Sequence, residues 1–385
     1  MTASPPLAPA SPRVASIDAL RGFDMFWIIG GQQVVLAILN LFVSPAPRWL
    51  KVQMDHMPWE GFSAWDLIMP LFLFIVGAAM PYSFARRIEA GASKGALYRK
   101  VFLRTLILFV LGMAAQGHLL AADLSQLHIY SNTLQAIACG YLIASIALIH
   151  LRAFAQVLLA ILLLVGYWLL MVLVPVPGSG AGLWEERANL ARYIDKAVLG
   201  SFRDGTTYTW LLSGLTFGAT VLLGVSAGHL LRTAMVAWKK VAALLAIGLV
   251  CLGLGWAWSQ EPWLDGWRCP IIKHLFTSSM VLWAGGWSYL LLAVFYLVID
   301  VLGFRKWSFF FIVIGSNAIL TYMAVHLIDF AHIANVFVGG VARNLMATHS
   351  PLLQAMGAGL VHWAAFAIVW LILLYLYRKG TLVRI

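Results

Sequence analysis

Long apolar runs separated by short polar stretches dominate the pattern of this sequence. Each run is about 20 residues long, which is the length that an α-helix needs to cross a bilayer. The runs are continuous rather than alternating, so helices are favoured over the strands of a β-barrel. The sequence therefore predicts ten spans, at residues 20–42, 65–85, 101–119, 132–150, 154–174, 210–231, 240–258, 276–300, 307–328 and 356–377.

Composition places the whole chain in the same class. Of its 385 residues, 62% are hydrophobic and 11% are charged, whereas soluble domains carry about 25% charged residues. We expect an all-α polytopic membrane protein, because no loop is long enough to hold a soluble domain. The predicted parts are a disordered lead at 1–16 and a single transmembrane domain at 17–380, with outer loops at 43–64, 175–209, 259–275 and 329–355.

The distribution of charge predicts the orientation. If both termini are cytoplasmic, the inner side holds 17 Lys and Arg and 4 acids, a net charge of +13. The outer side then holds 9 Lys and Arg and 11 acids, a net charge of −2. This bias agrees with the positive-inside rule. The overall charge of +11 therefore indicates topology and attraction to anionic membrane lipid rather than nucleic-acid binding. A basic entrance for a cytoplasmic polyanion is a compatible interpretation.

Two further features bear on the loops. Within 175–209, apolar residues from Trp184 to Leu199 predict a short amphipathic helix on the outer surface. The three cysteines, of which only Cys269 lies in a loop, support neither a disulfide framework nor a metal site.

Polar residues inside the first span are candidates for function, because ionisable groups are costly in hydrocarbon. Asp18, Arg21 and Asp24 follow one another at helical spacing and predict an ion network at the inner end. Further along, Gly30 and Gly31 allow a helix or ligand to approach closely. The amides of Gln32 and Gln33 come next and supply donors and acceptors.

The stretch "MDHMPWEGFSAWDLIMPLFLFIVGAAM" (54–80) joins a polar fringe to the second span. His56, Trp59 and Glu60 would share one face if the segment is helical. Asp66 begins the span, where a carboxylate caps the helix and stabilises its dipole. Imidazole is the side chain best suited to proton transfer near neutral pH, which singles out His56.

Other spans carry polar groups of the same kind. They occur in "IYSNTLQAIACGY", "CPIIKHLFTSSMVLWAGGW" and "FIVIGSNAILTYMAVHLIDF". Together with the first two spans, they predict a polar cavity that opens outward. The residues singled out in these three stretches are Asn132, Gln135, Lys273, Asn317 and His326.

The order of these motifs resembles the heparan-α-glucosaminide N-acetyltransferase family. "SIDALRGFDMFW" is followed by H-x-P-W-x-G, D-L-I-x-P-x-F-L-F-I-V-G, "SNTLQAIACGYL", "PIIKHLFTSSMVLWAGG" and "IGSNAILTY". The resemblance implies transfer of acetyl from cytoplasmic acetyl-CoA to the amine of glucosamine, or of a terminal glucosaminide, across the membrane. It also implies the inner membrane of a bacterium as location, and a homodimer.

The resemblance implies roles for single residues as well. The histidine of the H-x-x-W-x-G motif, proposed as catalytic in the family, corresponds to His56. An asparagine that assists it corresponds to the amides of Gln32 and Gln33. The family's L-Q-R-I reads "LQAI" at 134–137, and the stretch between Gln33 and His56 is longer than usual.

The chemistry fits the residues in two ways. His56 either accepts the proton of the attacking amine or carries the acetyl group itself. Asp55 or Glu60 could orient the imidazole or hold the sugar's ammonium, and Gln32 or Asn317 could donate to the oxyanion. We predict catalysis by His56, Gln32 and Asp55 without a metal. The predicted acceptor residues are Gln33, Trp59, Glu60, Asp66, Asn132, Gln135, Lys273, Asn317 and His326. The predicted CoA residues are Arg21, Arg86, Arg87, Arg99, Lys100 and Arg104.

Two other function classes explain part of the pattern. A proton-coupled transporter of an amino sugar or similar solute would use His56 and Asp66 as a proton relay. It accounts for an outward polar cavity but leaves the basic inner cluster to topology alone. A membrane scaffold without catalysis accounts for neither the buried amides nor His56.

Overall fold

The computed structural model describes residues 14–43, 46–260 and 267–383, and the secondary structure of these ranges is helical apart from isolated β-bridges. Residues 1–13 of the predicted lead lie outside them, and the first helix begins at Ala15. The helices are α1 (Ala15–Phe26), η1 (Trp27–Gly31), α2 (Gln32–Leu39), α3 (Arg48–Gln53), η2 (Ala64–Leu67), α4 (Ile68–Glu89), α5 (Lys94–Gln116), η3 (Leu119–Ala121), α6 (Thr133–His150), α7 (Ala153–Leu173), α8 (Leu190–Leu199), η4 (Gly200–Phe202), α9 (Gly214–Arg232), α10 (Ala237–Ser259), α11 (Ser278–Phe295), η6 (Tyr296–Val301), α12 (Ser308–Ser316), α13 (Ala318–Leu327), α14 (Phe330–Met346) and α15 (Pro351–Arg378).

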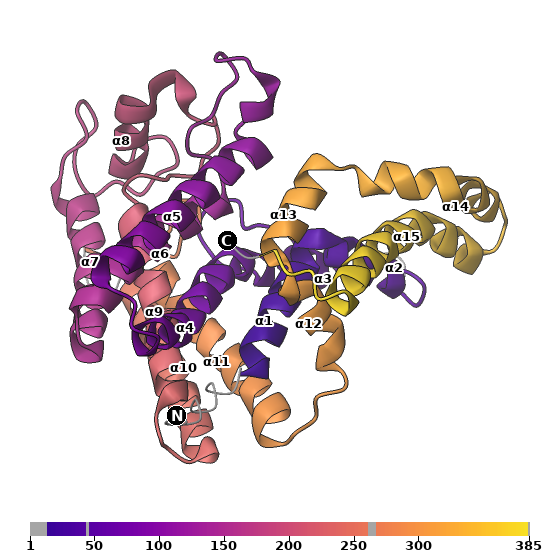
Figure 1. Ribbon diagram of the computed structural model, residues 1–385. Coiled ribbons are helices and arrows are strands. Elements are labelled where there is room, and N and C mark those ends of the chain that lie inside the picture. The colour runs from indigo at the N-terminus through magenta and orange to yellow at the C-terminus, as the bar shows by residue number, and fades with distance from the viewer. Residues whose placement is uncertain (1–13, 44–45, 261–266, 384–385) are drawn as a thin grey trace, which may run out of the picture.

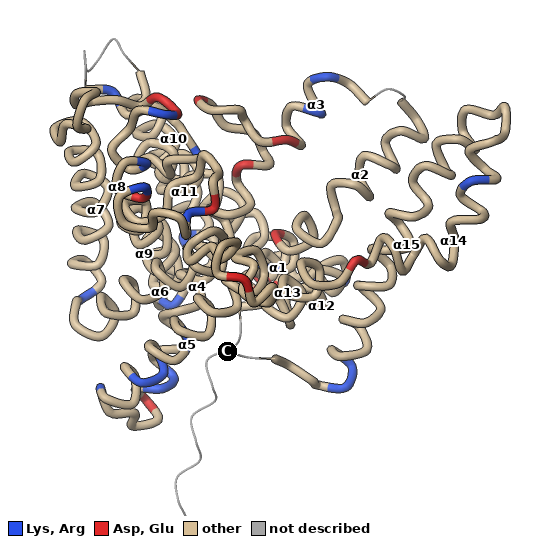
Figure 2. The backbone as a smooth tube through the Cα atoms, turned by 90° about the horizontal axis from the view of Figure 1, so that it is seen from above, with Lys and Arg blue, Asp and Glu red and all other residues tan. Residues whose placement is uncertain are grey.

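Helices long and apolar enough to cross a membrane confirm the predicted polytopic class. Eight occur among the described residues, and a bent pair would make a ninth. The predicted third span corresponds to α5, which is not among the eight and which carries the basic residues of 94–104 in its first half. Figure 2 shows these basic residues gathered where α4 ends and α5 begins.

The predicted ninth span is not continuous. Helices α12 and α13 meet at Asn317 with a bend of 73°. The Asn317 amide donates to the Thr381 carbonyl at 3.1 Å and accepts from the Val383 amide at 2.8 Å. These bonds tie the residue to the chain's C-terminal segment. Hydropathy along the sequence does not reveal the break, because α12 and α13 are both apolar.

The predicted outer loop at 329–355 is largely helical. Helix α14 fills most of it and packs against α15, and Figure 1 shows the pair standing to one side of the bundle. The short turn between the two helices ends at Pro351, which begins α15 where a proline is tolerated.

The centre of the bundle consists of α4, α6 and α9 (Figure 1). Helices α4 and α9 approach each other very closely at two glycines. A Cβ atom on Gly77 would lie 2.0 Å from the Val221 carbonyl oxygen, and a Cβ atom on Gly224 would lie 2.0 Å from the Phe74 carbonyl oxygen. Only glycine permits this contact. The tight packing fixes the position of α4, and η2, which leads directly into α4, carries part of the site described below.

The predicted amphipathic helix in the longest outer loop is confirmed only for its second half, α8. Trp184 and Ala188 precede the helix, and Trp184 forms a bridge with Asn189 instead. Leu190 and Leu199 are buried as expected, whereas Val198 is 68% exposed. A buried acid, Asp195, fixes the helix by accepting the backbone amides of residues 210 and 211 at 2.7 and 3.0 Å.

Candidate functional site

His56 lies in a loop between α3 and η2, so the shared helical face predicted for His56, Trp59 and Glu60 is absent. Pro58 lacks the amide hydrogen that a helix interior needs. The loop is held instead by the segment before α11. The Gly61 amide donates to the Ile271 carbonyl at 2.9 Å, and Glu60 forms an antiparallel bridge with Ile272. Residues more than 200 positions apart thereby form one surface.

Asp66 combines a capping role with a contact to the histidine. It forms a capping box with Ser63, whose backbone amide and hydroxyl donate to Asp66 Oδ2 at 3.0 and 3.1 Å. The other oxygen, Oδ1, lies 2.8 Å from His56 Nδ1. Asp66 is fully buried, whereas the His56 side chain is 40% exposed. The carboxylate therefore holds the ring through Nδ1, and the imidazole remains partly open to solvent.

Lys273 completes the cluster from the segment before α11. Its Nζ atom lies 3.4 Å from Asp66 Oδ1, and 3.0 and 3.4 Å from Nδ1 and Nε2 of His56. The side chain is only 6% exposed. We call His56, Asp66 and Lys273 the outer cluster. Sequence analysis singled out all three, but their adjacency depends on the fold.

Burial changes the titration of two groups in the 267–276 segment, outside the spans. Desolvation lowers the pKa of Lys273 from its ordinary 10.5 to about 8, although Asp66 opposes the change. Desolvation, aided by the charge of Lys273, lowers the pKa of His274 to about 4. Lys273 therefore changes charge within reach of physiological pH, and His274 stays neutral there.

The predicted catalytic partners Asp55 and Gln32 contact the loop rather than the ring. The Asp55 carboxylate accepts the backbone amide of His56 at 2.8 Å. The Gln32 amide donates to the Met54 carbonyl. Both positions help to shape the histidine's segment, and Asp66 rather than Asp55 contacts the imidazole. Gln33 is exposed on α2.

Aromatic side chains surround the outer cluster. The Trp59 indole donates to the Trp184 carbonyl at 2.9 Å and meets His274 edge to face, with ring centroids 5.4 Å apart. Tyr208 lies 4.4 Å from the same imidazole and 6.0 Å from Lys273 Nζ. Sequence analysis missed Tyr208, because a loop tyrosine carries no local signal of this placement.

Glu60 forms a two-point ion pair with Arg268, at 3.1 and 3.3 Å. This pair joins the His56 loop to the segment that carries Lys273. Within the described structure, the Glu60 and Asp55 carboxylates bond to Arg268 and to the His56 backbone amide, and neither bonds to the imidazole.

The other predicted acceptor residues on spans 4 and 9 do not contact the outer cluster. The prediction of one polar cavity built from five spans is therefore wrong for these residues. Asn132 caps α6, accepting from the amides of Leu134 and Gln135, and donates to the Gly112 carbonyl. Gln135 accepts the Ser131 amide at 2.8 Å. His326 bonds to the carbonyl one turn before it at 2.8 Å. These side chains bond to backbone groups, as does Asn317 at the bend.

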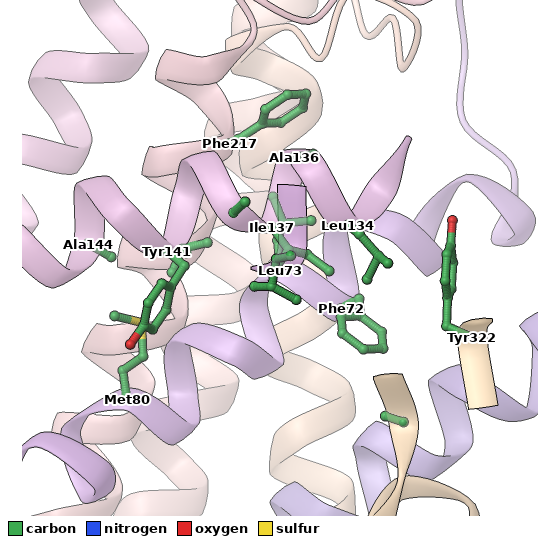
Figure 3. Close-up of a cluster of buried hydrophobic side chains, with 14 of the residues drawn as sticks. Phe72, Leu73, Met80, Leu134, Ala136, Ile137, Tyr141, Ala144, Phe217 and Tyr322 are labelled. Atoms are coloured by element: carbon green, nitrogen blue, oxygen red, sulfur yellow. The ribbon is translucent and has the colours of Figure 1, made fainter. Parts of the chain in front are cut away.

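A second feature lies toward the other end of α4. A cavity of about 490 Å³ between α1, α4, α5, α6 and α12–α13 is lined by four of the six predicted CoA residues, which are Arg21, Arg86, Arg87 and Arg104. We call it the arginine cavity. Arg99 and Lys100 are exposed on α5 and do not line it. Figure 3 shows apolar lining residues on facing stretches of α4 and α6, namely Phe72, Met80, Leu134 and Ile137.

The arginines of this cavity have few acidic neighbours. Arg21 pairs with Asp18 at 3.0 Å, and the Arg104 guanidinium lies 4.5 Å from the Tyr141 ring centroid. No ion pair to Arg86, Arg87 or Arg104 occurs among residues 14–43, 46–260 and 267–383. A cavity with these walls suits a ligand that has an anionic end and an apolar arm.

Comparison with known proteins agrees with the motifs. No model of a known protein family matches the chain. The chain is similar to proteins of Homo sapiens and Mus musculus that are both named heparan-alpha-glucosaminide N-acetyltransferase. Identity is 26% over 377 residues and 24% over 374, and each match covers 82% of this chain. The chain spans about half the length of these relatives, 53% and 55%. This similarity agrees with the resemblance in the motifs.

Proposed function

We propose that the protein is a membrane N-acetyltransferase that moves acetyl from acetyl-CoA to the amine of glucosamine or of a terminal glucosaminide. One observation carries the proposal: the outer cluster and the arginine cavity adjoin opposite ends of α4. The helix has 22 residues, so about 30 Å separates its ends. Donor and acceptor would enter from opposite sides and meet within the bundle.

The arginine cavity supports acetyl-CoA as the donor. The donor's nucleotide end carries phosphate groups, and arginine binds phosphate through charged, often two-point hydrogen bonds. Its pantetheine arm is long and largely apolar, like the wall between α4 and α6 (Figure 3). Arg86, Arg87 and Arg104 would receive the phosphates, with Arg21 beside Asp18 at the margin.

His56 is the proposed centre of the chemistry. The amine nitrogen forms a bond to the acetyl carbon, the carbon–sulfur bond of the thioester breaks, and CoA leaves as the thiol after taking up a proton. His56 Nε2 accepts the proton that the amine loses. In an alternative route, Nε2 attacks first and carries the acetyl group to the amine. In both routes Asp66 accepts the Nδ1 hydrogen and holds the ring, which lies 2.8 Å away.

Lys273 is the best-placed group to stabilise the oxyanion. The two amides proposed from sequence use hydrogens elsewhere, Gln32 on Met54 and Asn317 on Thr381. The Lys273 ammonium lies 3.4 Å from the nitrogen that performs the chemistry. A buried positive charge there would stabilise negative charge that develops on the carbonyl oxygen. Trp59 and Tyr208 supply aromatic faces beside it for the acceptor.

The orientation belongs to the same proposal. The arginine cavity would face the cytoplasm and the outer cluster the periplasm of a bacterial inner membrane, with both termini cytoplasmic. The basic residues at the end of α4 and in the first half of α5 (Figure 2) support this assignment under the positive-inside rule. A homodimer in membrane lipid is part of the proposal by analogy with the family.

One assay tests the activity. The full-length protein, purified in an uncharged detergent, is given acetyl-CoA with glucosamine or with glucose as the acceptor that lacks the amine. We expect N-acetylglucosamine and free CoA in equal amounts from glucosamine and no product from glucose. CoA release without an acetylated amine, or no turnover with any amino sugar, would contradict the proposal.

The bent pair α12–α13 is the observation that favours a transporter, because interrupted helices often line transport pathways. Proteoliposomes that contain the protein separate the two functions. Uptake of labelled glucosamine in an unmodified form, without acetyl-CoA, would favour the transporter. Appearance of acetylated product that requires acetyl-CoA on the opposite side would favour the enzyme.

A further inference from the structure

Asp24 is a buried carboxylate that neither the fold nor the proposed chemistry uses. It lies on α1, is 0% exposed, and neither of its oxygens has a hydrogen-bond partner in the described part of the chain. The ion network predicted for the first span is therefore only partly present, because Arg21 pairs with Asp18 alone. A buried carboxylate without a partner is unfavourable. This residue requires an explanation that packing does not give.

A second cavity has this residue in its wall, although both carboxylate oxygens are covered in the described structure. It measures about 440 Å³, lies between α1, α4 and α11, and has Asp24 among its lining residues. Four indoles share the lining, which are Trp27, Trp65, Trp283 and Trp287. We call it the tryptophan pocket. It shares no lining residue with the arginine cavity, which adjoins other faces of α1 and α4.

We propose that the tryptophan pocket binds a hydrophobic organic ammonium ion, with the ammonium at Asp24 and the carbon body among the indoles. A cation is the charge complement of the carboxylate, and the faces of aromatic rings attract cations, most strongly those of tryptophan. The rest of the wall is mainly apolar, with Leu67, Ile68 and Leu71 in it, so a ligand must bring apolar surface as well as charge.

Other occupants fit less well. A metal ion needs several oxygen ligands, and the pocket's second short polar side chain, Ser63, already bonds to Asp66 and to the Asp55 carbonyl. A phosphate-bearing ligand would face the carboxylate and meet no arginine or lysine in this lining. The head group of a membrane lipid stays at the interface, whereas Asp24 is fully buried on α1, one helical turn beyond Arg21.

The pocket also adjoins the segment that carries His56. Met54, whose carbonyl accepts the Gln32 amide, lines it, and so does Ser63, which holds Asp66. Trp65 lies between the two sites, with its ring 6.4 Å from that of His56. An occupant would touch residues that position the histidine. The binding site nevertheless goes beyond the proposed activity and does not depend on it.

Binding of a matched pair of probes tests the proposal. Equilibrium dialysis of the full-length protein would compare labelled phenethylammonium with phenethyl alcohol, which has nearly the same shape and no charge. We expect the cation to bind at least about tenfold more tightly. Asp24→Asn should remove most of that difference, by about tenfold, and leave binding of the alcohol unchanged. Glu89→Gln, at an exposed acid on α4, should bind both probes as the unchanged protein does.

The remaining outcomes also decide the matter. If Asp24→Asn does not fold, Trp283→Leu serves instead and should weaken the cation more than the alcohol. Equal affinity for the two probes in the unchanged protein would overturn the proposal without any variant. Unchanged binding of the cation to the Asp24→Asn variant would also overturn the proposal. Displacement of the cation by acetyl-CoA would overturn it as well, because it would place the probe in the arginine cavity.

Discussion

The two ends of α4 hold polar groups in opposite states. In the outer cluster, Asp66 accepts four hydrogen bonds and each of the three side chains touches the other two. In the arginine cavity, positive charges face open space, and in the described ranges only Arg21 has an acidic partner there. Groups that perform chemistry gain from fixed geometry, whereas groups that capture an anion gain from remaining available. The contrast predicts that variants at the two ends fail in different ways.

Removal of the imidazole should give the largest effect. We expect His56→Ala to lower turnover by about a thousandfold, because both proposed routes need Nε2. Binding of CoA, measured by calorimetry, should change by less than about twofold because the arginine cavity is intact. His349→Ala, at an exposed histidine in the turn between α14 and α15, should leave both quantities unchanged. If His56→Ala weakened CoA binding as strongly as it lowers turnover, the two ends of α4 would not differ in function.

Asp66 tests whether the outer cluster is preorganised. Asp66→Asn keeps the shape but leaves the Lys273 ammonium buried without a counter-charge. We expect turnover to fall by about a hundredfold and the free energy of unfolding to fall by about 3 kcal/mol. Lys273→Met combined with Asp66→Asn should recover part of the stability and none of the activity. If the double variant is as unstable as the sum of the single ones, the two groups are not coupled.

The arginine cavity should respond in affinity alone. Arg87→Ala and Arg104→Ala should each raise the Kd for CoA by about tenfold, the strength of one charged hydrogen bond. Turnover at saturating acetyl-CoA should stay within about threefold. Arg99→Ala and Lys100→Ala are matched controls, because they remove the same charge from exposed positions of α5 outside the lining. If the controls weaken CoA equally, the ligand responds to the general basic field and not to this cavity.

How far the sequence predicts this contrast differs between the two ends. The apolar runs predict most helices, and four of the six basic residues predicted for CoA line the cavity, because hydrophobicity and charge are local signals. The pairing of His56 with Lys273 joins residues 217 positions apart. No periodicity encodes such a contact. The resemblance pointed to His56, but only the fold places Asp66 rather than Asp55 against its ring.

The errors have a common physical origin. Asn132, Gln135 and Asn317 are polar and lie within apolar runs, which suggests function, yet each satisfies backbone groups at a helix end or bend. A sequence does not show where such ends fall to within a turn. Conversely, the sequence predicts Asp24 in an ion network, and its carboxylate has no hydrogen-bond partner among the described residues. Burial and bonding decide these cases, and both are properties of the packed chain.

The charge of Lys273 gives a smaller and distinctive effect of pH. Its pKa is about 8 in the folded protein and 10.5 when unperturbed, so the unfolded chain binds more protons between these values. The free energy of unfolding should therefore rise with pH from about 8 to 10.5. Turnover should instead fall as pH rises through about 8, because the ammonium is lost. Lys273→Met should abolish both dependences, as followed by thermal unfolding and by rate profiles. A falling limb that persists in Lys273→Met would assign it to another group.

The smallest effect is expected at Glu60, which sequence analysis assigned to the acceptor and which the structure pairs with Arg268. The Glu60 side chain is 47% exposed, so solvent screens the pair, and Glu60→Gln should lower the free energy of unfolding by less than about 1 kcal/mol. If the residue only joins the two loops, KM for glucosamine should change by less than about threefold and turnover should not change. An increase in KM of tenfold or more, with the stability unaffected, would instead place the acceptor's ammonium on Glu60. The outer cluster would then include a group that changes partner when substrate arrives, which would weaken the contrast with the arginine cavity.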